Sequence, residues 1–292
     1  MKRILFLFLL CQPLHLVALE QTRALWVTRW DYSAPEDIDA IMRDAADVGF
    51  NTILFQVRGN GTVTYPSKIE LQSEQFRGKD PDMLALAVER AHALGLQLHA
   101  WINVLPGWSG AELPTSEEQL YLKHPAWFMV DAYGRRELRE HYLFLSPTLP
   151  QVRAYLLELC RELYTNYAVD GIHFDYLRFP ASTFSYDPLS VALFTENAGA
   201  KPSERPAAWR LWRQKAIDAF LENVYEEIKF YKPGLILSAA VLPDRSAARD
   251  IFFQDATGWL ARGHIDVIYP MLYADENQIY KRELDDYMRN SH

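Results

Sequence analysis

The segment from Asp170 to Pro180 carries the residues best suited to chemistry, because it is typical of a buried strand that ends in polar side chains. Alternate side chains of a strand share a face, so His173 and Asp175 point the same way. Burying a carboxyl group and an imidazole is costly unless they are hydrogen-bonded or used. We therefore predict that Asp175 is a catalytic general acid/base, oriented by His173 and Arg178. The alternative is structural: Asp175 pairs with Arg178 and braces the fold.

Neighbouring strands are expected to present groups that grip a sugar. Alternation places His99, Trp101 and Asn103 on one face, with Asn103 nearest the end of its strand. An indole suits the flat apolar face of a sugar, and a carboxamide both donates and accepts hydrogen bonds. His99, deeper in the strand, is expected to be a hydrogen-bonded core residue. The same alternation gives four other predicted binding residues, which are Gln56, Arg58, Tyr269 and Tyr273. Arg178 is also predicted to bind the substrate.

A hydrolase that uses two carboxylates needs a partner for Asp175. Asp275 follows the last predicted strand in Tyr273-Ala274-Asp275 and is expected to face the same end of the fold, as the second catalytic carboxylate. A water molecule that Asp275 activates, or the substrate's own N-acetyl group, would serve instead. Other acids that could fill this role are Glu112, Asp131, Glu137 and Asp187. The sequence leaves these routes open, and with them the retaining or inverting outcome.

Six short apolar runs alternate with helical patterns, which indicates a parallel α/β fold. The expected strands are 24–30, 52–58, 96–104, 171–178, 235–242 and 265–273, and the expected helices lie near 38–48, 84–94, 152–163 and 206–231. Two insertions, about 105–149 and 180–206, follow the third and fourth strands. That end of a TIM (β/α)8 barrel holds the active site. The competing arrangement is a Rossmann-like sheet, but Gly59-Asn60-Gly61 lacks the third glycine and the helix that a dinucleotide site needs.

The composition excludes several classes of function. The chain has 292 residues with 30 Lys and Arg against 38 Asp and Glu, a net charge of -8, which argues against a nucleic-acid partner. Its 8 His and 2 Cys show no metal-ligand spacing. Neither a Gly-x-Ser-x-Gly motif nor a phosphate loop is present. We therefore expect no metal and no cofactor.

The N-terminal residues 1–18 are predicted to be a signal peptide. A basic start precedes the apolar run Ile4–Leu10, and Ala18 offers a small residue before a cut. The apolar run is too short to span a bilayer. We therefore expect export to the periplasm or cell envelope. Cys11 would allow attachment to the membrane through a lipid, but Leu10 stands where a lipoprotein signal has a small residue, so lipidation is not favoured.

The ordered motifs of the chain resemble those of the glycosyl-hydrolase-like family 10 proteins, formerly a domain of unknown function. The matching segments are Arg23–Val27, Asn51–Arg58, Tyr65–Ser67, His99–Asn103, Leu145–Pro147, Asp170–Pro180 and Ile265–Tyr273. The resemblance implies a TIM-barrel glycosidase of bacterial cell-wall glycan, because one member of the family cuts peptidoglycan strands that lack stem peptides. The expected partner is therefore that polysaccharide.

Two features depart from the family pattern. Family barrels continue past the strand that ends at Tyr273 into a seventh and an eighth strand. We therefore expect residues 19–292 to form one barrel domain that is incomplete after its sixth strand and helix, with exposed edge strands. Members often have two adjacent Asp residues where this chain has Asp175 and Tyr176. An incomplete site would fit the alternative function, a non-catalytic glycan-binding barrel of the cell envelope.

Overall fold

The structure of the protein is a computed structural model that describes residues 21–110, 112–136 and 142–291. The predicted signal peptide, Cys11 and Glu137 lie outside the described residues. No helix within the described part is long and apolar enough to cross a membrane.

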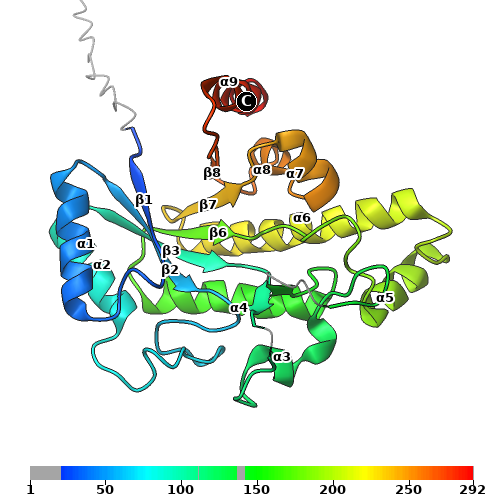
Figure 1. Ribbon diagram of the computed structural model, residues 1–292, viewed down its shortest axis with the longest axis horizontal. Helices are drawn as coiled ribbons and strands as arrows, with labels where there is room; N and C mark the ends of the chain where they lie inside the picture. Colours follow the sequence, from blue (N-terminus) through cyan, green and yellow to red (C-terminus); the bar gives the residue numbers. More distant parts are fainter. Residues whose placement is uncertain (1–20, 111, 137–141, 292) are drawn as a thin grey trace, which may run out of the picture.

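A curled sheet of six parallel strands forms the centre of the fold (Figure 1). In spatial order its strands are β1 (Ala24–Val27), β2 (Thr52–Arg58), β3 (Gln97–Asn103), β6 (Gly171–Asp175), β7 (Ile236–Val241) and β8 (Val267–Pro270). Every neighbouring pair is parallel, and each expected strand is present, β2 with the expected bounds and the other five with trimmed ends. The arrangement is a half-barrel in which strands alternate with helices, which confirms the predicted fold class.

Helices connect successive strands. The four expected helices are α1 (Pro35–Asp47), α2 (Met83–Ala93), α4 (Pro150–Asn166) and α6 (Pro206–Tyr231), and three more, α7 (Arg245–Phe252), α8 (Ala256–Ala261) and α9 (Asn277–Asn290), lie toward the C-terminus. Proline opens α1, α4 and α6, where a missing amide hydrogen costs nothing. The Asp82 side chain caps α2 by accepting from the amides of Leu84 and Ala85. The apolar positions of α4 expected from the sequence are buried.

The two insertions contain elements that periodicity did not reveal. The first holds a two-stranded antiparallel ribbon of β4 (Pro106–Trp108) and β5 (Leu143–Phe144), the helix α3 (Leu120–Lys123) and the 3-10 helix η1 (Pro125–Trp127). The second holds α5 (Pro188–Ala198), which the Asp187 carboxylate caps. An isolated bridge between Asp131 and Phe184 joins the insertions. They therefore pack together, beyond the carboxyl ends of β3 and β6.

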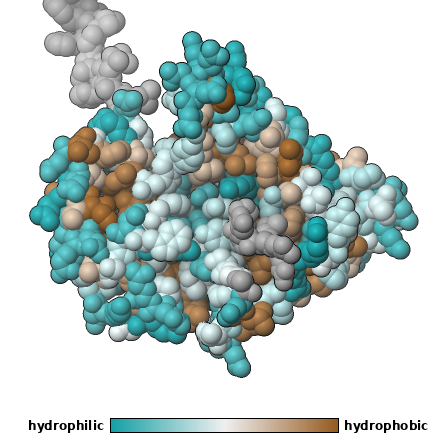
Figure 2. All heavy atoms as spheres, viewed as in Figure 1, coloured by the Kyte–Doolittle hydropathy of each residue, from teal (hydrophilic) through white to brown (hydrophobic). Residues whose placement is uncertain are grey.

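The edge strands are less covered than the centre. All four residues of β8 and the first three of β1 are partly exposed, whereas all seven residues of β2 are buried. Figure 2 shows apolar residues reaching the surface near α1 and β1, and again around α7 and α8 below α9. The sheet orders β1 and β8 at opposite edges without a hydrogen-bonded ladder between them. The arc is therefore open, as expected for these six strands.

Arg58 lies on the opposite face of β2 from the one we expected. The register between β2 and β3 shifts between Gln56 and Arg58, and this irregularity pairs Arg58 with Ile102 rather than with an inward residue. The Arg58 guanidinium instead forms a bidentate ion pair with Glu70, with an Nε–Oε2 distance of 2.7 Å, and Tyr155 of α4 donates to the same carboxylate. Arg58 also donates to three main-chain carbonyl groups. Its hydrogen-bonding capacity is thus used inside the protein.

We predict that Glu70→Gln lowers the free energy of unfolding by about 3–5 kcal/mol, because both side chains of the pair are 1% exposed and the change leaves a buried unpaired guanidinium. Urea unfolding measured by circular dichroism would show this as a lower midpoint. Asp39→Asn is the matched control, since its ion pair with Arg90 is 40% exposed on both sides. Equal effects of the two substitutions would contradict the prediction.

Candidate active site

The sheet register brings most of the predicted site residues together in two rows. Trp101 pairs with Gln56 on one side and with His173 on the other, and His173 pairs with Ser238 of β7. One step nearer the carboxyl ends, Asn103 of β3 pairs with Asp175 of β6. Residues paired in a parallel sheet point to the same face, so these rows form the inner surface of the arc.

His173 sits at the centre of the inner row and uses both ring nitrogens. The indole Nε1 of Trp26, which can only donate, lies 3.1 Å from His173 Nε2. The proton of the neutral ring is therefore on Nδ1, which lies 2.9 Å from Ser238 Oγ. Burial lowers the pKa of His173 to about 3, so the ring is neutral at physiological pH. The side chain makes no hydrogen bond to Asp175 in the described structure and holds the arc together instead.

His99 is buried as expected but is not hydrogen-bonded as expected. Within the described part of the chain neither ring nitrogen has a hydrogen-bond partner, although the residue is only 2% exposed. The ring lies against Gly171, where a Cβ atom would come within 2.7 Å of it. Burial lowers the pKa of His99 to about 4. His99 is thus a neutral space-filling group below the row of His173.

Asp175 ends β6 in a buried position, with 7% of its surface exposed. Its Oδ1 accepts from the Tyr176 amide at 2.6 Å and lies 3.5 Å from Arg178 Nη1, which is too long for a strong hydrogen bond. Burial raises the pKa of Asp175, while Arg178 and the Tyr176 amide oppose the rise. No described group donates to Oδ2. A carboxyl group with a raised pKa and a free oxygen can give a proton to a leaving group or take one from water.

The expected strand 171–178 includes Tyr176, and the structure corrects this expectation. The strand ends at Asp175, and Tyr176 adopts a left-handed conformation with φ of 52°. A non-glycine residue in this region stores backbone strain, which is common beside active sites. In this turn the Tyr176 amide donates to Asp175. The centroid of the Tyr176 ring lies 5.2 Å from that of Tyr142 in the first insertion. Tyr176 therefore borders the site.

The other predicted binding residues differ in accessibility. Trp101 Nε1 donates to Asn103 Oδ1 at 3.1 Å, which leaves the Asn103 amide nitrogen without a partner in the described part of the chain. Gln56 is buried, and its Oε1 accepts from the main-chain amide of Arg29. Tyr269 packs edge-on against His173, with ring centroids 5.6 Å apart. Tyr273 is 76% exposed. Partial desolvation and, to a smaller extent, the negative charge of Asp175 raise the pKa of Tyr273. Tyr273 is thus the exposed member, whereas Asn103 is only 2% exposed.

The acids proposed as a second carboxylate are not brought to Asp175 by any described contact. Asp275 is exposed and has no hydrogen-bond or ion-pair partner among the described residues. Asp131 is held by the main-chain amides of Tyr133 and Arg135 and by the Arg135 side chain. Asp187 is 1% exposed and bonds to Ser190. Asp175 is therefore the single carboxylate that the described contacts assign to this site.

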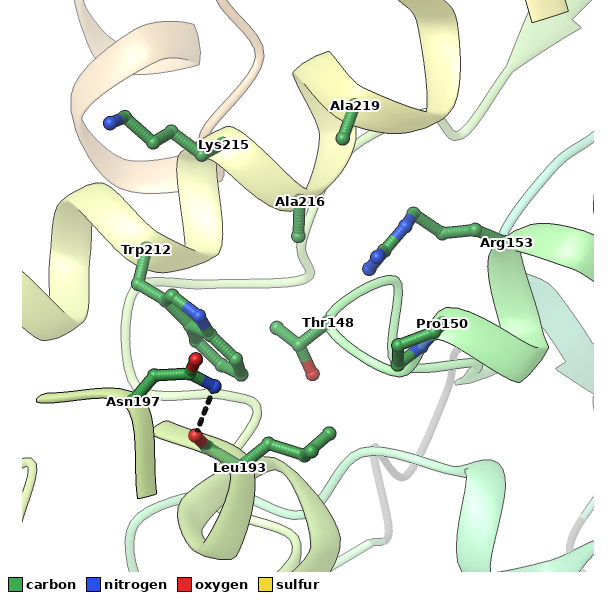
Figure 3. Close-up of a pocket in the computed structure, with 9 residues that line it drawn as sticks. All are labelled: Thr148, Pro150, Arg153, Leu193, Asn197, Trp212, Lys215, Ala216 and Ala219. Atoms are coloured by element: carbon green, nitrogen blue, oxygen red, sulfur yellow. Dashed lines mark hydrogen bonds between the residues drawn. The ribbon is translucent and has the colours of Figure 1, made fainter. Parts of the chain in front are cut away.

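Two further observations bound the chemistry. Within the described residues, no three His, Cys, Asp or Glu side chains are grouped as ligands of a metal ion. A pocket of about 200 Å³ lies between α4, α5 and α6, and Figure 3 shows Trp212, Arg153 and Lys215 around it. No predicted site residue lines this pocket. The Arg153 guanidinium within it donates to the Pro147 carbonyl.

Three residues of the site were not predicted from the sequence. Trp26 lies in the matching segment Arg23–Val27 but was not predicted to face the inside of the sheet. Alternation along the first strand, which places Trp26 and Thr28 on the same face, could have indicated this. Ser238 carried no distinguishing pattern in an apolar strand. Arg29 follows the first strand, and its backbone amide bonds to Gln56 Oε1 at 3.1 Å. Its guanidinium lies over the Trp30 ring at 4.4 Å.

A curled parallel sheet with a buried acid at the carboxyl end of one strand is the arrangement found in TIM-barrel enzymes. Among solved structures, the glycoside hydrolase domain of PgaB (BpsB) from Bordetella bronchiseptica has the same fold, with a TM-score of 0.67 and 14% sequence identity, over 92% of this chain and 81% of that chain. The chain belongs to the Glycosyl hydrolase-like 10 family, whose family model matches residues 21–290. The resemblance inferred from the motifs is thus confirmed.

Two curated relatives carry the name glycosyl hydrolase. DigH of Escherichia coli (strain K12) is 28% identical, and the match covers 77% of this chain and 55% of that protein. YngK of Bacillus subtilis (strain 168) is 26% identical, over 80% of this chain and 48% of that protein. The chain therefore spans about half the length of the curated relatives it matches. Family membership implies a carbohydrate partner.

The buried histidines predict how stability depends on pH. Below about pH 6.5 the unfolded chain binds a proton at His99, while the folded protein excludes it until the pH falls to about 4. As the pH is lowered through this window, the free energy of unfolding should therefore decrease by up to about 1.4 kcal/mol per pH unit for each such histidine. Urea unfolding at pH 4.5 to 7.5 measures the slope. We expect a shallower slope for His99→Met, and an unchanged slope would contradict the assignment.

Proposed function

We propose that this chain is a glycosidase that hydrolyses bacterial cell-wall glycan, specifically peptidoglycan strands lacking stem peptides, with Asp175 as the general acid/base. The observation that carries the proposal is the position of Asp175, a carboxyl group with a pKa raised by burial at the carboxyl end of β6 in a member of a glycosyl-hydrolase-like family. Two neighbouring groups suit contact with a sugar: the exposed ring of Tyr273, and the Asn103 amide nitrogen, which has no partner in the described part of the chain.

In the proposed reaction Asp175 protonates the glycosidic oxygen as the bond to the anomeric carbon breaks. The ionised carboxylate then removes a proton from the water that attacks this carbon. Arg178 stabilises the carboxylate that forms after proton transfer, and the Tyr176 amide fixes its orientation. The second participant is either Asp275, carried to the site by the segment after β8, or the N-acetyl group of the substrate.

The proposed location is the periplasm or cell envelope, where this glycan lies. It rests on the predicted signal peptide at residues 1–18. Attachment through a lipid on Cys11 is not part of the proposal.

We predict that Asp175→Asn lowers the release of new reducing ends from peptide-free peptidoglycan by roughly 10²- to 10⁴-fold, because the amide cannot transfer the proton. Mass spectrometry of the products would measure the release and show which bond is cut. Asp44→Asn, an exposed substitution on α1, is the matched control and should match the parent. Circular dichroism would confirm that all three proteins are folded. Equal hydrolysis by folded Asp175→Asn would refute the role of Asp175.

The pH profile tests the same role independently. A general acid must be protonated, so kcat should fall as the pH rises through the pKa of Asp175 in the complex. Because Arg178 lowers this pKa, Arg178→Gln should move the alkaline limb of the profile to higher pH. A limb that stays in place would argue against proton transfer by Asp175.

A second candidate function is glycan binding without hydrolysis. It is favoured by the absence of a second carboxylate among the described contacts of Asp175. If the protein only binds glycan, the Asp175→Asn variant would keep the affinity of the parent for glycan strands. The parent itself would release no reducing ends. Tryptophan fluorescence titration measures this affinity, and release of reducing ends by the parent would exclude the candidate.

A further inference from the structure

The pocket between α4, α5 and α6 has a positively charged lining. Arg153 of α4 and Lys215 of α6 line it together with Trp212, and none of the described lining residues is acidic. Figure 3 shows the Arg153 guanidinium and the Trp212 ring on opposite sides of the space. Ala216 and Ala219 of α6 also border it, and their small side chains leave it open. The pocket therefore suits a small ligand that carries a negative charge.

Arg153 offers this pocket hydrogen-bond donors that are both unused and accessible. Its Nη1 donates to the Pro147 carbonyl at 2.7 Å, which fixes the guanidinium. Its Nε and Nη2 have no hydrogen-bond partner among the described residues, and both remain open to solvent. Burial lowers the pKa of Arg153, and no acidic group acts against this effect. Nε and Nη2 form one side of the guanidinium fork, and Arg58 uses the same two atoms to hold the Glu70 carboxylate.

Trp212 forms a fixed aromatic wall of the pocket. Its ring stacks on that of Trp209, with centroids 5.1 Å apart and an angle of 19° between the planes. It also packs edge-on against Phe194 of α5, with centroids 5.7 Å apart. The side chain is partly exposed, and its Nε1 has no partner among the described residues and remains open to solvent. A fixed indole with a free donor suits a sugar ring and its hydroxyl groups.

The start of α4 adds to the positive potential in the pocket. Pro150 lines the pocket and is the first residue of this helix, and the N-cap residue Leu149 makes no side-chain hydrogen bond. The N-terminus of a 17-residue helix carries a partial positive charge that favours a nearby anion. The helix therefore acts in the same direction as the Arg153 guanidinium.

We propose that this pocket is a second glycan site, which binds one carboxylate-bearing sugar unit. Arg153 holds the carboxylate through Nε and Nη2, and the Trp212 indole contacts the sugar ring. The volume of about 200 Å³ is below the roughly 300–1,000 Å³ of pockets for drug-sized ligands, which fits a single sugar. In peptidoglycan, each N-acetylmuramic acid unit that has lost its stem peptide carries a free lactyl carboxylate. The inference rests on the proposed function for this class of glycan, but not for hydrolysis.

The test follows the indole N–H signal of Trp212 in nuclear magnetic resonance spectra of isotope-labelled protein, with Trp212→Phe identifying the signal. The probes are N-acetylmuramic acid, N-acetylglucosamine, which lacks the lactyl carboxylate, and acetate, which lacks the sugar. We expect N-acetylmuramic acid to shift the signal with a Kd roughly 10-fold lower than either other probe, as for one charged hydrogen-bonded contact. An equal Kd for either other probe, or an unmoved Trp212 signal, would overturn the proposal.

Variants assign the preference to Arg153. Arg153→Gln should bring the Kd values of the two sugars together, and Arg153→Lys should restore only part of the difference because the planar fork is lost. Ala219→Leu keeps Arg153 and its bond to Pro147 but fills the space, so it should weaken binding of N-acetylmuramic acid. Arg43→Gln, which removes an exposed charge on α1, should behave as the parent. An undiminished preference in folded Arg153→Gln would count against the site.

The same spectra separate this site from the candidate active site. The indoles of Trp26 and Trp101 lie on the inner surface of the arc, and their signals report a sugar bound there. A shift confined to these two signals would contradict a second site. If the Trp212 signal responds as expected while the parent leaves peptide-free strands uncut, the second site stands and the proposed hydrolysis fails. Cleavage of the strands with an unmoved Trp212 signal has the opposite meaning.

Discussion

The inner surface of the arc depends on one neutral histidine that is hydrogen-bonded on both sides. His173 accepts from Trp26 of β1 and donates to Ser238 of β7, and so it joins strands that are not neighbours in the sheet. The rings of Trp101 and Tyr269 pack around it. In a closed barrel the last strand would pair with the first, whereas here side chains in the interior provide the contact between the two edges. A charged imidazole could not do this, because it has no acceptor for the indole.

This row of side chains sets the environment of Asp175. Asp175 lies one register step toward the carboxyl edge, above a layer of aromatic rings that surrounds the buried His173. Burial in that layer raises its pKa, and the Tyr176 amide and Arg178 limit the rise. The left-handed turn at Tyr176 places its amide there, so backbone strain after the strand and the electrostatics of the acid have one structural cause.

The sequence predicted the parallel α/β arc and the shared face of His173 and Asp175, because strand alternation is a local property. It failed where the backbone departs from regularity. The register shift after Gln56 moves Arg58 to the helix-facing side, and the turn at Tyr176 ends the strand early. Neither irregularity has a glycine or proline to mark it. The bond from Trp26 to His173 joins residues 147 positions apart, and no local pattern encodes it.

Two opposing effects set the protonation of Asp175. Burial raises its pKa, and the positive charge of Arg178, whose Nη1 lies 3.5 Å from Oδ1, acts against the rise. The cation favours the ionised acid, which opposes the protonated form that a general acid requires, so burial has to outweigh the cation before the reaction begins. The net direction of the pKa shift is upward, as this requirement demands. Once the proton has left, the same cation stabilises the carboxylate that must take a proton from water, so each of the two effects serves one step of the proposed reaction.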